Sequence, residues 1–246
     1  MTLLEIVQQF CLRSGIPKPV TVTGSTDTQV LQIQALLEEE GNDLATRGDW
    51  EALTIEANHT TLAAESQGAI GTIATNGFRY IKNQTIWDRT DRLPVIGPIN
   101  SRQWQGLKSV VLTGPRYQFR IRGGNLLVNP VPVAGHDWAF EYISKNWIIS
   151  ADGITYKNLF TLDTDEFLLP DTLLLMGLRW RWMREKGLDY SELFSTYEAQ
   201  IKDMIGRDGG KAVLHMDNTG QIASPGTFIP SGNWNNPSLM GLLGSI

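Results

Sequence analysis

The sequence has 246 residues, of which 41% are hydrophobic and 19% are charged, with a formal net charge of −5 at pH 7. A chain of this length predicts one or two domains and buries enough apolar surface to fold without disulfides or a structural metal. Proteins that grip DNA usually carry a basic face, and the overall acidic balance argues against that class.

The first residues, MTLLEIVQQF, lack the basic region of a secretory signal. No apolar run approaches the roughly 18–20 residues that a membrane span needs. We therefore expect a protein made in the cytoplasm, without a membrane partner. Cys11, the single cysteine, lies in an apolar helical pattern, which predicts a small core residue instead of a nucleophile.

Two helices are predicted before residue 50. Residues 2–14 form the first, with a capping box made by Thr2 and Glu5. The second runs from about residue 27 to residue 47 and has an apolar stripe. Its Glu38-Glu39-Glu40 run predicts a solvated face, and an acidic surface for a partner is the alternative.

Short β-type runs broken by Gly, Pro and Asn replace the helical spacing from residue 53 to about residue 158. Residues 117–122 alternate strictly, and Gly123-Gly124 predicts a tight hairpin turn into the next strand. A long strand is predicted over residues 137–147 and a short helix over residues 101–107. This block is expected to be an antiparallel β domain inserted between helices.

Helices return at about Pro170, with one predicted to end at residue 186 and another over residues 190–205. Four acidic residues precede or open the first of these: Asp163, Asp165, Glu166 and Asp171. A calcium loop would need a glycine and a ligand spacing that this segment lacks. Helix capping and compensation of the helix dipole are therefore the expected roles of these acids.

The last forty or so residues are rich in Gly, Pro, Asn and Ser, yet they carry large apolar side chains that a solvated linker would lack. The side chains expected to bind a partner are Phe228, Ile229, Trp234, Leu239, Met240, Leu242 and Leu243. The segment has no periodic face with which to build a core of its own. Its composition therefore predicts an arm that docks on another protein, and folding back on its own subunit is the alternative.

Signatures of catalysis are missing from the sequence. Gly206–Lys211 follows a predicted helix, so it does not form a phosphate-binding loop. The three histidines lack neighbours at metal-ligand spacing, and no G-x-S-x-G motif occurs. Carboxylates that the fold brings together, as in glycosidases, remain open. We expect no enzyme activity, no cofactor and no metal.

Four tryptophans of the predicted β domain raise an alternative function: Trp87, Trp104, Trp138 and Trp147. Exposed indole rings stack on sugars, which would suit a tail-associated carbohydrate-binding or hydrolytic protein. Burial in a core or an interface is the commoner role of such residues.

Several stretches carry a resemblance to a known family. They read LLEEEGNDLATRGDWEALT, GFRYIKNQTIWDRT, RLPVIGPINSRQWQGLK, YQFRIRGGNLLVNPVPVAGHDWAFEYISKNW and LRWRWMREKGLDYSELFSTYEAQI. Together they resemble the head-to-tail adaptor proteins of short-tailed bacteriophages, which are akin to the tail tubular A proteins. The resemblance covers most of residues 3–210 and is weakest in the C-terminal tail.

The resemblance implies a structural protein of the virion, located at the head–tail junction. It implies an α+β fold with a helical scaffold, an inserted β domain and a C-terminal arm that reaches the portal protein. Twelve identical subunits would form a ring beneath the portal. The ring would extend the channel through which DNA passes without specific binding, and would support the next tail or nozzle protein.

The expected domain boundaries follow from the two changes of period. Residues 1–50 and 165–206 make the helical domain, 51–164 the β domain, and 207–246 the portal-docking arm. Contacts between subunits are expected at four residues of the helix that starts near Pro170: Trp180, Arg181, Trp182 and Arg184. The alternative for its basic residues is pairing with carboxylates of the same chain.

Overall fold

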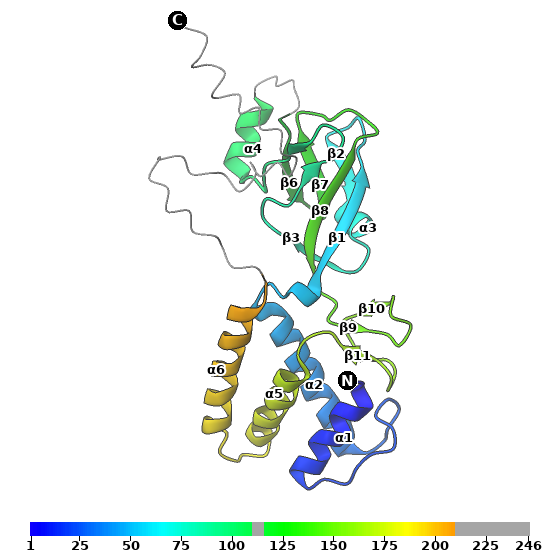
Figure 1. Cartoon of the computed structure of the whole chain (residues 1–246), viewed down its shortest axis with the longest axis vertical. Helices are drawn as coiled ribbons and strands as arrows, with labels where there is room; N and C mark the ends of the chain where they lie inside the picture. The colour runs from blue at the N-terminus through cyan, green and yellow to red at the C-terminus, as the bar shows by residue number, and fades with distance from the viewer. Residues whose placement is uncertain (110–115, 210–246) are drawn as a thin grey trace, which may run out of the picture. The chain divides into compact units, whose positions relative to one another are not determined.

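The computed structural model describes residues 1–109 and 116–209 (Figure 1). Helices stand at both ends of this described part, and antiparallel strands lie between them. The predicted α+β fold class is confirmed. The predicted portal-docking side chains, from Phe228 to Leu243, lie outside the described residues.

Helix α1 (Leu3–Ser14) begins and ends as its sequence predicts. The Thr2 side chain accepts a hydrogen bond from the Glu5 amide, and the Glu5 side chain accepts one from the Thr2 amide. Gly15 ends the helix at φ 68°, a left-handed conformation that suits glycine. Cys11 is buried on the inner face of this helix, as predicted.

Helices α2 (Thr28–Arg47), α5 (Asp171–Glu185) and α6 (Ser191–Arg207) build the rest of the helical part. Helix α5 packs against α1, α2 and α6, although about 120 residues separate it from α2 (Figure 1). The predicted packing of the N-terminal helices on the C-terminal ones is therefore confirmed. No helix in the described ranges has the length and apolar character that crossing a bilayer requires.

Two antiparallel sheets form the β block, which spans residues 54–144. Strand β8 (Asp137–Ser144) pairs with three strands of the larger sheet, namely β1 (Thr54–Thr60), β3 (Phe78–Ile81) and β4 (Trp87–Asp88), and β4 also pairs with β5 (Leu93–Pro94). The smaller sheet contains β2 (Ser66–Ala69), β6 (Gln118–Arg122) and β7 (Asn125–Asn129). Helices α3 (Ile70–Ile73) and α4 (Ser101–Lys108) connect strands, whereas the short 3-10 helix η1 (Glu51–Leu53) lies between α2 and β1.

The predicted hairpin is present, since β6 and β7 pair around Gly123 and Gly124, both at positive φ. The predicted strand over residues 137–147 is shorter, because β8 ends at Ser144. The Trp147 ring leaves the sheet and packs edge-on against Phe160 and Phe167, within the core of the helical part.

A third small sheet also belongs with the helices. It consists of β9 (Ile148–Ile149), β10 (Tyr156–Lys157) and β11 (Glu166–Phe167). Apolar side chains of residues 147–167 join the helical core, whereas the β block has a separate core around Trp138, Phe140 and Tyr142. Residues 147–164 were predicted in the β domain, and their side chains correct that assignment.

Asp163 and Asp165 do not cap α5, contrary to the prediction. Asp163 accepts hydrogen bonds from the amides of Val22 and Thr23 and from the hydroxyls of Thr21 and Thr23. Asp165 accepts hydrogen bonds from the amides of Thr161 and Leu162 and from Lys157. Both carboxylates satisfy loop amides that no helix or sheet pairs, and only Asp171 lies in the first turn of α5.

Two helical glycines allow close approach to the side chains of neighbouring elements. Gly41 of α2 lies under the Trp147 ring, and Gly177 of α5 lies against the carboxylate of Glu40. A methyl group at either position would overlap these buried groups. Gly206 of α6, by contrast, faces open space.

Alanine substitutions test this packing. Gly177→Ala should lower the free energy of unfolding by about 1–3 kcal/mol, because the core has no room for another methyl group. Gly206→Ala is the matched control, and it should raise stability by about 0.5–1 kcal/mol through helix propensity. Chemical denaturation measures both, and equal effects would contradict the close approach of α5 to Glu40.

Candidate functional site

A cluster of buried polar side chains joins α2, α5 and α6. Glu40 of α2 is fully buried, and its carboxylate accepts hydrogen bonds from the Nε of Arg181, at 2.6 Å, and from the hydroxyl of Tyr197. Arg181 comes from α5 and is 4% exposed, while Tyr197 comes from α6 and is fully buried. One carboxylate therefore ties three helices together.

The other two guanidinium nitrogens of Arg181 contact carboxylates of α2. Its Nη1 pairs with Glu39, and its Nη2 donates to Asp43 at 3.0 Å. We call these five residues the Glu40 cluster: Glu39, Glu40, Asp43, Arg181 and Tyr197. The prediction of a solvated face for the Glu38–Glu40 run is wrong at Glu40, which faces α5.

The surroundings of the cluster shift the titration of two of its members. Burial raises the pKa of Glu40, although the hydrogen bonds from Tyr197 and Arg181 and the charge of Arg181 oppose this shift. Burial and the neighbouring Glu40 charge raise the pKa of Tyr197 well above its ordinary value. The tyrosine hydroxyl thus keeps its proton and remains a donor to Glu40.

Removing the arginine tests how much the cluster contributes. Arg181→Ala should lower the free energy of unfolding by about 3–5 kcal/mol, because Glu40 would stay buried without its countercharge. Arg184→Ala, on the same helix, should cost less than about 1 kcal/mol, because the Arg184 side chain is 37% exposed. Urea denaturation of both variants checks this, and similar losses would contradict the account.

All four predicted inter-subunit residues have partners within one chain, and Arg184 pairs with Glu185 at 3.0 Å and with Glu39 at 3.6 Å. Trp180 and Trp182 are buried on opposite sides of α5, the first against Phe194 and Tyr197 and the second against Phe10. Arg181 belongs to the Glu40 cluster. The alternative for the two arginines, pairing with carboxylates of the same chain, is therefore present in the structure. Contact of the four residues with a neighbouring subunit stays a prediction.

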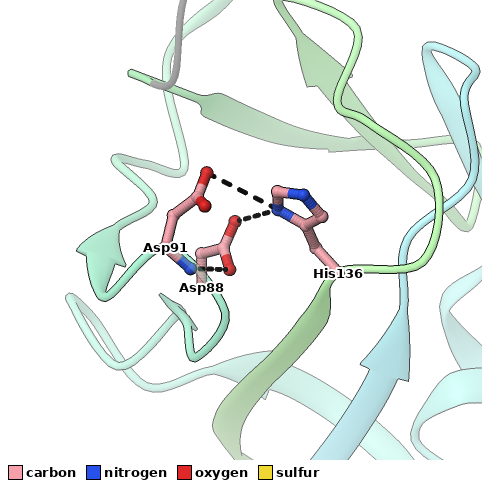
Figure 2. A group of neighbouring side chains, drawn as sticks. All are labelled: Asp88, Asp91 and His136. Carbon is pink, nitrogen blue, oxygen red and sulfur yellow. Dashed lines mark hydrogen bonds and ion pairs between the residues drawn. The ribbon is translucent and has the colours of Figure 1, made fainter.

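A second polar cluster lies in the β block (Figure 2). It contains Asp88 at the end of β4, Asp91 in the following turn and His136 just before β8. The Nδ1 of His136 lies 2.9 Å from the Oδ2 of Asp88 and 3.6 Å from the Oδ2 of Asp91. The fully buried Asp88 also accepts, through Oδ1, hydrogen bonds from the amides of Thr90 and Asp91.

Asp88, Asp91 and His136 offer three ligand atoms within 4.8 Å of one another, a set of donors that suits a divalent cation. Both carboxylate oxygens of Asp88, however, already accept hydrogen bonds from the protein. These bonds close the turn after β4 and tie it to the start of β8. The geometry therefore explains the cluster as a structural ion pair.

Sequence reasoning missed this cluster because its members come from separate segments. The pairing of β4 with β8, which sets Asp88 opposite Trp138, brings His136 to the aspartates. The short Asp88-Arg89-Thr90-Asp91 motif is the one local signal. It indicates a turn and carries no information on its distant partner.

The ion pair makes a pH-dependent contribution to stability. The hydrogen bond to Asp88 raises the pKa of His136, as do the charges of Asp88 and Asp91, while burial acts in the opposite direction. The hydrogen bonds to Asp88 lower the pKa of that carboxyl despite its burial. At pH 5–6 the histidine is therefore protonated and the carboxylate ionised.

A histidine substitution tests this linkage. The stabilisation by His136 should be fully present below its unfolded-state pKa of about 6.5 and lost as the pH rises through the higher folded-state pKa. The difference in melting temperature between wild type and His136→Gln should thus be largest near pH 5–6 and shrink above about pH 7. His59→Gln, whose ring lies beside Gln67, is the control and should show no such trend. A gap that widens with pH would contradict the ion pair.

Three of the tryptophans considered for sugar stacking are inaccessible. Trp104, Trp138 and Trp147 are each at most 1% exposed, and Trp87 is half-buried. The structure thus gives these three rings the alternative role, packing in a core. Comparison of the sequence with models of known families and with curated proteins gave no match.

Proposed function

We propose that this chain is a structural head-to-tail adaptor subunit of a short-tailed bacteriophage, which assembles as a ring beneath the portal. The observation that carries the proposal is the Glu40 cluster. Its acidic members lie in the LLEEEGNDLATRGDW stretch, and Arg181 and Tyr197 lie in the LRWRWMREKGLDYSELFSTYEAQI stretch. Two stretches that resemble the adaptor family are thus joined by buried polar contacts.

The roles of the buried carboxylates favour a structural protein over a hydrolase. Glu40, Asp88 and Asp165 are fully buried, and each accepts hydrogen bonds from groups of the protein itself. A catalytic carboxylate must instead present an oxygen to a substrate within hydrogen-bond reach. These three acids hold helices, strands and loops in place, which is what a ring subunit requires.

The proposal also assigns the C-terminal arm to binding of the portal, and this part is argued from the sequence. Burying one large apolar side chain contributes roughly 1.5–3 kcal/mol. Trp234, Phe228 and the Leu239–Leu243 group would therefore offset part of the cost of ordering an arm on a partner. In a ring, each arm acts at high effective concentration once its neighbours are seated.

Truncation tests the arm. A chain that ends at residue 209 should keep the melting temperature of the full chain, because α6 ends at Arg207. It should bind rings of the portal protein encoded by the same phage at least about 100-fold more weakly, since it loses its apolar anchors. Trp234→Ala in the full chain should give a smaller loss. Analytical ultracentrifugation of the mixtures measures both, and wild-type affinity of the truncated chain would contradict the docking role.

A further inference from the structure

The overall negative charge conceals a basic segment. Residues 92–136 hold six of the 21 Lys and Arg residues and none of the 26 Asp and Glu residues. The segment contains α4 and the hairpin of β6 and β7, two strands of the smaller sheet (Figure 1). The acidic excess of the chain thus lies entirely outside it.

Four arginines of this segment lie in the first turn of α4 and in or just before β6. Arg120 and Arg122 occupy alternate positions of β6, so they share the face opposite to the buried Phe119. The Nη2 of Arg120 donates to the Ser101 hydroxyl at 2.8 Å, which places the first turn of α4 beside this face. Arg102 follows Ser101 and Arg116 precedes β6. We call Arg102, Arg116, Arg120 and Arg122 the arginine face.

The cations of the arginine face have no countercharge in the described part of the chain. Arg102, Arg116 and Arg122 are exposed, Arg120 is half-buried, and the ion pairs between described residues involve none of the four. Lys108, at the other end of α4, differs because it pairs with Glu65 at 2.8 Å. Like charges held together on a rigid strand and helix favour the binding of an anion.

Most exposed side chains of α4 and of the hairpin turn are polar, although Ile96, which pairs with Gln118 of β6, is 55% exposed. Ser101, Gln103 and Gln105 of α4 and Asn125 of the hairpin are exposed. Arginine is also enriched in the core of protein–protein interfaces, but there it accompanies aromatic and Met side chains more than hydroxyls and amides. A surface of guanidinium, amide and hydroxyl groups matches a phosphate backbone better, since guanidinium binds phosphate oxygens with two parallel hydrogen bonds.

A groove of about 390 Å³ adjoins the arginine face. Arg120 lines it together with Phe78, Tyr80 and Phe119, and Tyr80 is 40% exposed. The lining also includes Arg79, a fifth arginine, and the amide of Asn83. Both are groups that bind phosphate oxygens, so the groove extends the polar surface of the arginine face.

We propose that the arginine face binds the phosphate backbone of double-stranded DNA, weakly and without sequence preference. The inference deepens the proposed function, on which it rests for its biological setting, because an adaptor ring is passed by DNA. The net charge of the whole chain argued against DNA binding. That sum combines this basic face with acidic residues elsewhere in the chain, so the proposal refines the expectation. Four phosphate contacts predict that the logarithm of the affinity falls with the logarithm of salt with a slope of about −3 to −4.

Fluorescence anisotropy of a short labelled duplex, titrated with the full chain between about 50 and 200 mM salt, tests the proposal. Arg120→Gln/Arg122→Gln should weaken binding at least about 10-fold at the lowest salt and reduce the slope by about 2. Arg102→Gln/Arg116→Gln should weaken binding by a similar factor. These two residues lie outside β6, so this variant still tests the proposal if the first variant fails to fold. Circular dichroism verifies the fold of each variant.

The matched control is Arg13→Gln/Lys18→Gln, which removes the same charge from exposed positions near the end of α1. Losses equal to those of the arginine-face variants would show an effect of net charge and overturn the proposal. Absence of binding by wild type at the lowest salt would also overturn it. If poly-L-glutamate binds more tightly than the duplex, the face suits an acidic protein instead of DNA, and the proposal is overturned. Because no portal is present, failure here leaves the adaptor proposal standing, and failure of portal binding leaves the arginine face standing.

Discussion

The position of the helices depends on one buried ion pair. Glu40 and Arg181 have lost their contact with water, which is costly unless each charge has close partners. Tyr197, Glu39 and Asp43 supply those partners, and they do so only in one register of α2 against α5 and α6. Gly177 belongs to the same constraint, since only a glycine leaves room for the Glu40 carboxylate.

The C-terminal end of α2 carries the contacts to the β block. Arg79 of β3 donates to the carbonyl of Ala45, and the Tyr80 hydroxyl donates to Asp49. Lys82 pairs with Glu51 at 2.7 Å. These contacts are polar and lie at the surface or half-buried, so the β block keeps its own apolar core while staying attached to the helical scaffold.

Local signals in the sequence predicted the elements well. The capping box of Thr2 and Glu5 and the Gly123-Gly124 turn each depend on residues within a few positions of one another. The helical and strand periods likewise report which face of an element is buried, which is why the packing of α2 on α5 was predictable.

The candidate sites were not predictable in the same way. Glu40 looked like part of a solvated run because its partner Arg181 lies 141 residues away. The same holds for Asp163, which binds the loop at Thr21–Thr23, and for the pairing of Asp88 with His136. In each case a charged residue is buried or fixed by a group from a distant segment, and no local spacing encodes that meeting. The arginine face was not predicted for another reason. Net charge is a sum over the whole chain, so it does not show where along the chain the charges lie.

The proposal that this chain is a ring-forming adaptor is tested most directly by electron microscopy of the purified chain mixed with rings of a portal protein encoded in the same genome. If the proposal holds, portal particles carry an added ring of density on one end, which shares the symmetry axis of the portal. Portal particles without added density, at chain concentrations well above those of the portal, would contradict it.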